Sequence, residues 1–75
     1  MEIVYVYQGG RDRALEDEIL AMFPGAQPIA CTPGMQGLTE VTIRLPPETD
    51  MAAVHRLRDM PRILDAARAS FGEGA

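Results

Sequence analysis

Short apolar segments, each followed by Gly or Pro, limit the possible folds of this chain more than any other feature. Strand-like runs rich in β-branched and aromatic residues or alternating in polarity occupy 2–7, 26–32 and 38–45. Stripes with helical spacing occupy 12–23 and 49–60. We therefore expect strand, helix, strand, strand, helix within one α+β domain over residues 1–71, followed by a disordered tail over 72–75.

The two stripes carry recognisable start and stop signals. Asp12 is a suitable N-cap for the first helix, and Pro24-Gly25 ends it. Thr49 or Asp50 is expected to cap the second helix, which Pro61 closes. The residues expected to face the core are Leu15, Ile19, Met22 and Phe23 in the first helix and Met51, Val54 and Leu57 in the second.

The last segment, Arg62–Phe71, has two interpretations. Its alanines and its apolar spacing favour a helix, with Gly72 as the C-cap. A shift of the chain by 37 residues, however, superimposes Leu20–Pro24 on Leu57–Pro61, and both have the form Leu-x-x-apolar-Pro. Two related strand–helix–strand units are expected of a split βαβ sandwich. We therefore predict a fourth strand, with a C-terminal helix as the alternative.

The helix exits carry a resemblance to known domains. The passages around Phe23-Pro24-Gly25 and over Leu57–Ala66 (LRDMPRILDA) resemble those of ACT-type and Lrp-type effector-binding domains. The first passage also resembles the maturation chaperones of periplasmic nitrate reductase. Arg62 departs from the pattern, because those families have Gly there. The resemblance implies a ferredoxin-like βαββαβ two-layer sandwich with an antiparallel four-stranded sheet, dimerisation, and an effector site after the first strand.

The composition argues against several classes of function. A net charge of −4 disfavours direct binding to nucleic acid. The single cysteine, Cys31, allows no internal disulfide, and no Cys/His spacing suggests a metal site. We expect no cofactor, no membrane segment and no targeting signal, and hence a cytoplasmic protein. Without a paired acid and base or a nucleophile set, a non-enzymatic protein is expected.

The loop Gly9-Gly10-Arg11 is the first candidate site. Two glycines let the backbone approach a ligand closely, and it precedes the expected start of a helix. The amides of that helix start, with Arg11, would favour a carboxylate or phosphate. The sequence thus indicates a small anionic effector here, against the simpler interpretation of a flexible turn with solvated arginines.

The second candidate site is the sheet face away from the helices. If Val4 and Val6 face the helices, alternation sends Tyr5 and Tyr7 outward. The same argument, with Val41 and Ile43 inward, sends Thr42 and Arg44 outward. The predicted patch, which consists of Tyr5, Tyr7, Thr42 and Arg44, is typical of a recognition surface.

These features together predict a small regulatory or binding module. We expect a homodimer formed through the tyrosine patch, with a protein partner or an anionic effector. The alternative is an acidic inhibitor that imitates nucleic acid through the solvated run Glu16-Asp17-Glu18. A maturation chaperone is a further, weaker interpretation.

Overall fold

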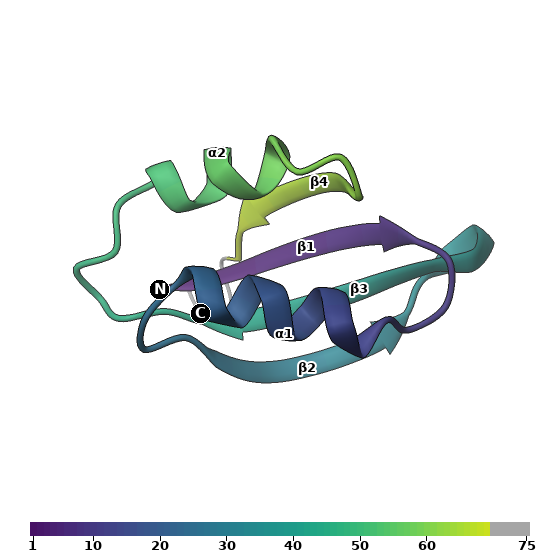
Figure 1. The fold of residues 1–75 in the computed structure, drawn as a ribbon, viewed down its shortest axis with the longest axis horizontal. Helices are drawn as coiled ribbons and strands as arrows, with labels where there is room; N and C mark the ends of the chain where they lie inside the picture. Colours follow the sequence, from purple (N-terminus) through teal and green to yellow (C-terminus); the bar gives the residue numbers. More distant parts are fainter. Residues whose placement is uncertain (70–75) are drawn as a thin grey trace, which may run out of the picture.

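The strands and α-helices follow one another along the chain in the predicted order, βαββαβ. The computed structural model describes residues 1–69 (Figure 1). Its elements are β1 (Glu2–Gln8), α1 (Arg13–Met22), β2 (Gln27–Pro33), the short 3₁₀ helix η1 (Met35–Gly37), β3 (Leu38–Arg44), α2 (Ala52–Arg58) and β4 (Ile63–Arg68). The predicted domain end at residue 71 and the predicted tail over 72–75 lie outside the described residues.

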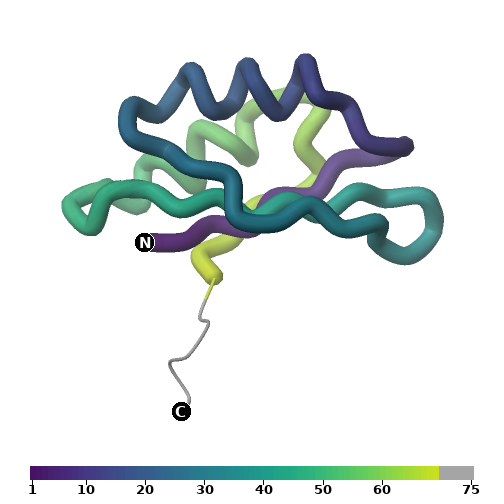
Figure 2. Tube along the Cα trace, turned by 90° about the horizontal axis from the view of Figure 1, so that it is seen from below, coloured from purple at the N-terminus to yellow at the C-terminus, as the bar shows by residue number. Residues whose placement is uncertain are grey.

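The four strands form one antiparallel sheet in the order β2-β3-β1-β4. Both α-helices lie on the same side of this sheet. Figure 2, turned by 90° from the view of Figure 1, shows this arrangement. The order βαββαβ with two layers is that of a ferredoxin-like α+β sandwich. Among the described residues, no helix has both the length and the apolar character needed to cross a membrane.

The last described element, β4, is a strand rather than a helix. It pairs with β1 from Ile3 opposite Arg68 to Tyr7 opposite Ile63, with an irregularity in the register between Val6 and Tyr7. The residues at issue are alanine-rich, so local propensity favours a helix. The unpaired edge of β1 offers backbone hydrogen bonds that outweigh this preference, because propensity is a weak prior against tertiary contacts.

The helices begin largely as predicted. The side chain of Asp12 accepts a hydrogen bond from the Leu15 amide, at 3.1 Å, and so caps α1. Asp50 accepts one from the Ala52 amide, at 2.9 Å, just before α2. The prediction for Met51 is wrong, because this side chain is exposed and Ala53 is buried in α2 instead.

The core lies between the helices and one face of the sheet. The expectation for β1 is wrong: Tyr5 and Tyr7 are 0% exposed and point toward the helices, whereas Val4 and Val6 are half-buried on the other face. The core residues are Ile3, Tyr5, Tyr7, Leu15, Ile19, Phe23, Val41, Ile43, Leu45, Ala53, Val54, Leu57, Ile63 and Ala66.

The pairing of β1 with β3 explains this orientation. Tyr5 lies opposite Val41 and Val4 lies opposite Thr42, and directly opposed residues share a face of the sheet. Each tyrosine buries more apolar area than a valine, so their placement inside the core is favourable. The two rings stack with centroids 6.3 Å apart.

The outer face of the sheet therefore has a different composition from the predicted tyrosine patch. We define the open face as Glu2, Val4, Val6, Ala30, Leu38, Glu40, Thr42, Arg44, Asp65 and Ala67, which share one side by strand alternation and register. Thr42 and Arg44 do lie on this side, as predicted. Thr42 is nevertheless only 7% exposed, and Arg44 pairs with Glu2 at 3.0 Å.

Candidate binding pocket

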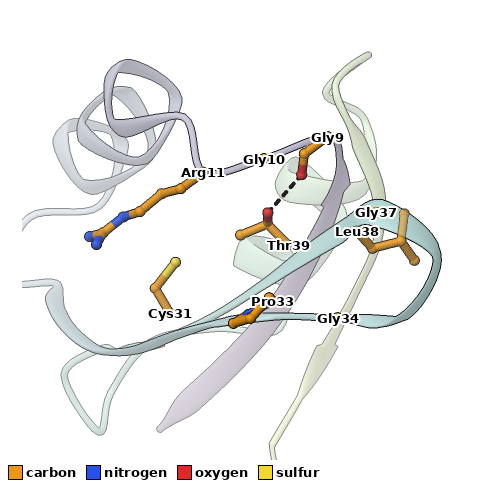
Figure 3. Close-up of a pocket in the computed structure, with 9 residues that line it drawn as sticks. All are labelled: Gly9, Gly10, Arg11, Cys31, Pro33, Gly34, Gly37, Leu38 and Thr39. Carbon is orange, nitrogen blue, oxygen red and sulfur yellow. Dashed lines mark hydrogen bonds between the residues drawn. The ribbon is translucent and has the colours of Figure 1, made fainter.

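The loop after β1 lines a pocket at one end of the sheet. This glycine pocket has a volume of about 380 Å³ and lies between the loop and the β2–β3 hairpin (Figure 3). Its lining residues are Gly9, Gly10, Arg11, Cys31, Pro33, Gly34, Gly37, Leu38 and Thr39. The three predicted effector residues, Gly9, Gly10 and Arg11, are therefore brought together at a concave surface.

Two hydrogen bonds tie the loop to the hairpin. The Gly9 amide donates to the Gly37 carbonyl at 2.8 Å. The Thr39 hydroxyl donates to the Gly9 carbonyl at 2.7 Å, the dashed line in Figure 3. Gly9 and Gly37 have φ of 98° and 76°, values that favour glycine. The loop and the hairpin that line the pocket are thus held in a defined geometry.

A second, smaller pocket adjoins the first. This Glu16 pocket has a volume of about 210 Å³ and is lined by Arg11, Glu16, Pro28, Ile29, Ala30, Cys31 and Val41. Arg11 and Cys31 belong to both pockets, and Figure 3 shows both side chains beside each other between the loop and β2. These two side chains therefore form the boundary between the pockets.

Glu16 is the centre of a polar network that the sequence interpretation missed. It was expected on a solvated face of α1, but it is buried, with 8% of the residue exposed. Its carboxylate accepts a hydrogen bond from the Tyr7 hydroxyl at 2.8 Å and pairs with the Arg11 guanidinium at 3.2 Å. Glu16 lies three residues before Ile19, so helical spacing places it beside the apolar stripe.

Tyr7 joins this network to the start of α1. Its hydroxyl donates to Glu16 and accepts a hydrogen bond from the Asp12 amide at 2.8 Å. Burial raises the pKa of Tyr7, and the hydrogen bond to Glu16 raises it further. The tyrosine therefore acts as a neutral donor that holds the carboxylate in place.

Cys31 closes the network on the side of β2. Its thiol lies 3.6 Å from a carboxylate oxygen of Glu16, as donor. Burial raises the pKa of Cys31, and the charge of Glu16 raises it further. A protonated thiol is a poor nucleophile, so its environment suits packing and weak hydrogen bonding rather than covalent catalysis.

The groups expected to attract an anion already have acidic partners. Arg11 is paired with Glu16. Asp12 caps the helix start and pairs with Arg62 at 3.1 Å; the hydrogen bond from the Leu15 amide lowers the pKa of this carboxyl, and the bond from Arg62 lowers it further. An anion at the start of α1 would lie close to both carboxylates, which repel it.

The network predicts acid sensitivity. Burial acts to raise the pKa of Glu16, but the hydrogen bonds from Tyr7 and Arg11 outweigh it, and the pKa is lowered overall. A carboxyl whose pKa is lower in the folded state stabilises the fold above its unfolded pKa, and this stabilisation disappears as the pH falls through the folded pKa. We therefore expect the free energy of unfolding to fall as the pH decreases from about 5 through the lowered pKa of Glu16.

Urea titrations of the wild type and Glu16→Gln at several pH values measure this effect. The variant is expected to have a shallower dependence on pH over that interval, with Asp17→Asn, an exposed acid on the same helix, as the control. Equal slopes for wild type and Glu16→Gln would show that Glu16 does not carry the acid dependence.

Comparison of this chain with known proteins finds no significant relative. No protein family, curated protein or solved structure matches it significantly. Over the part of the chain that the structure describes, no group of three or more His, Cys, Asp or Glu residues is arranged to hold a metal ion. The glycine pocket and the open face are therefore the features of this molecule that bear on its function.

Proposed function

We propose that this chain is a small non-enzymatic regulatory module that forms a homodimer through its open face and takes a small effector in the glycine pocket. The observation that carries this proposal is the open face itself. Within residues 1–69, both helices lie on the other side of the sheet (Figure 2). Val4 and Val6, both half-buried, belong to the central strand β1.

The composition of the open face supports a second copy as its occupant. One row across the sheet is apolar or small apart from Thr42, and it consists of Ala30, Thr42, Val4 and Ala67. Small side chains leave a sheet surface flat enough to pack against an identical surface. Charged residues occupy the rows on either side of this row: Glu40 and Asp65 flank Val6, and Arg44 pairs with Glu2.

The size of the face favours a reversible dimer. Four strands of about seven residues cover roughly 20 Å by 20 Å, or about 400 Å², if the added surface of the side chains is not counted. This area is smaller than the about 600 Å² per partner that the smaller specific interfaces bury. The charged positions of the face are acidic overall, with Glu2, Glu40 and Asp65 against Arg44. Like charges screened by salt repel less, so we expect association to be unchanged or tighter at higher salt.

Leu38 gives the pocket a physical connection to the dimer. It lines the glycine pocket and, by alternation along β3, belongs to the open face. An effector packed against Leu38 would therefore contact a residue at the edge of the interface. This connection supports a regulatory role, in which occupation of the pocket changes the strength of association.

The substitution Val4→Glu tests the dimer. Two glutamates facing each other across the interface are expected to weaken association by roughly 100-fold or more, because like charges at an interface cost several kcal/mol. Val4 is only half-buried, so the monomer is expected to stay folded. Sedimentation velocity over a range of concentrations measures the change.

Ala21→Glu is the matched control. It introduces the same charge at an exposed position of α1, on the opposite layer of the molecule. It is expected to sediment as the wild type does. A wild type that remains monomeric at millimolar concentration, or equal behaviour of the two variants, would disprove the dimer through this face.

A further inference from the structure

Arg11, one of the two side chains between the pockets, is held there by its ion pair with Glu16. Arg11 and Glu16 line the smaller pocket together, and Arg11 also lines the larger one. The guanidinium donates to both carboxylate oxygens, over distances of 3.2 to 3.4 Å. Movement of the Arg11 side chain away from Glu16 would join the pockets and leave the carboxylate at the inner end of a single cavity.

The two partners of this pair differ sharply in burial. The side chain of Arg11 is 55% exposed, whereas that of Glu16 is 11% exposed. Release of Arg11 into water costs little, since an exposed arginine is readily hydrated. Loss of a cation from Glu16 costs more, because a buried carboxylate without its partner is strongly unfavourable.

This difference decides which ligand charge the cavity accepts. An anion that recruits Arg11 would strip Glu16 of its cation and would lie near a buried negative charge. A cation that replaces Arg11 keeps Glu16 paired and frees Arg11 into solvent. The hydrogen bond from Tyr7 keeps the carboxylate oriented in either case.

A second observation points to an unfilled polar position beside the same pocket. Tyr5, Val41 and Cys31 are successive neighbours across the sheet on its helix-facing side, and Val41 and Cys31 line the Glu16 pocket. Tyr5 is fully buried, and its hydroxyl oxygen has no hydrogen-bond partner. A buried hydroxyl without a partner is costly. Tyr5 lines neither pocket, so a ligand N–H donor reaches its oxygen only after the lining side chains shift.

We infer that the joined cavity is a site for a small organic cation with N–H donors on an alkyl body, of the alkylguanidinium or alkylammonium type. The charged head takes the place of the Arg11 guanidinium on Glu16. The alkyl body lies in the glycine pocket against Pro33 and Leu38. This inference specifies the chemical class of the effector and rests on the proposed binding of an effector in the glycine pocket. The cationic effector replaces the anionic one that the sequence indicated.

Arg11→Ala with ethylguanidinium as the probe tests the site. The variant removes the resident cation, so ethylguanidinium is expected to bind it in the low millimolar range, about the limit for so small a ligand. At ten times its Kd the probe is expected to raise the Tm of Arg11→Ala by at least about 4 °C. Amide shifts at Gly10, Cys31 and Thr39 should report the same binding by NMR.

Two variants control for general effects of the probe. Arg44→Ala removes an exposed arginine from the open face, and ethylguanidinium is expected not to raise the Tm of this variant. The double variant Arg11→Ala/Glu16→Gln keeps the shape of the cavity without its charge, and it is expected to lose both the rise in Tm and the amide shifts. An equal rise in Tm for Arg11→Ala and Arg44→Ala, or a rise that persists in the double variant, would overturn the inference.

Propionate and the Val4→Glu background complete the experiment. Tighter binding of propionate than of ethylguanidinium to the wild type would overturn the inference in favour of the anionic effector. The same titration of Arg11→Ala combined with Val4→Glu is expected to show unchanged cation binding, because the cavity does not use the open face. Failure of the dimer and failure of the cation site are thus observed separately.

Discussion

Replacement of Tyr5 and Tyr7 together by Ala is expected to yield a chain that is largely unfolded at 25 °C. Both side chains are 0% exposed. Each such truncation in a core costs about 3–5 kcal/mol, while a chain of this length has roughly 4–11 kcal/mol of stability in total. The loss is not strictly additive, because the two rings contact each other. Far-UV circular dichroism and the dispersion of amide NMR signals measure the outcome.

Val4→Ala with Val6→Ala is the matched control for this result. It removes the alternate side chains of the same strand, which are half-buried on the open face. It is expected to cost about 1 kcal/mol per site or less and to leave the domain folded. A folded tyrosine variant together with an unfolded valine variant would show that β1 has the opposite orientation.

Leu57→Ala is expected to have the second-largest effect, a loss of about 2–5 kcal/mol in the free energy of unfolding. Helix α2 has seven residues and no side-chain bond from its N-cap residue, Met51. A helix so short is not stable alone and depends on packing, which Leu57 provides at 0% exposure. The midpoint of urea unfolding measures the loss.

His55→Ala serves as the control on the same helix, because His55 is exposed and is expected to contribute less than about 0.5 kcal/mol. Amide hydrogen exchange adds a local measurement, since Arg58 of α2 donates to the Ala66 carbonyl of β4 at 2.8 Å. Exchange in β4 should accelerate in Leu57→Ala. Equal unfolding midpoints for the two variants would contradict a central role of Leu57.

The error in β1 has an identifiable source in the sequence. A shift of 37 residues also superimposes Val4 and Val6 on Val41 and Ile43, two buried residues of β3, and this weak similarity favours the wrong side of β1. Glu2 and Gln8 share their side of the strand with the two valines. Two polar residues at that parity indicate the exposed face, so alternation within the strand was a better guide than weak internal similarity.

The order of elements, the α1 cap at Asp12 and the strand–helix–strand repeat were determined by the sequence alone, because apolar spacing, capping side chains and Pro-Gly breaks act over a few residues. The predicted fourth strand, β4, is confirmed, whereas the inward position of the tyrosines and the burial of Glu16 were decided by the tertiary structure. Both depend on groups far apart in the chain, such as Val41 opposite Tyr5 and the thiol of Cys31 beside Glu16. Local patterns indicate which side of an element is apolar, but the free energy of burial arises only when distant segments exclude water together.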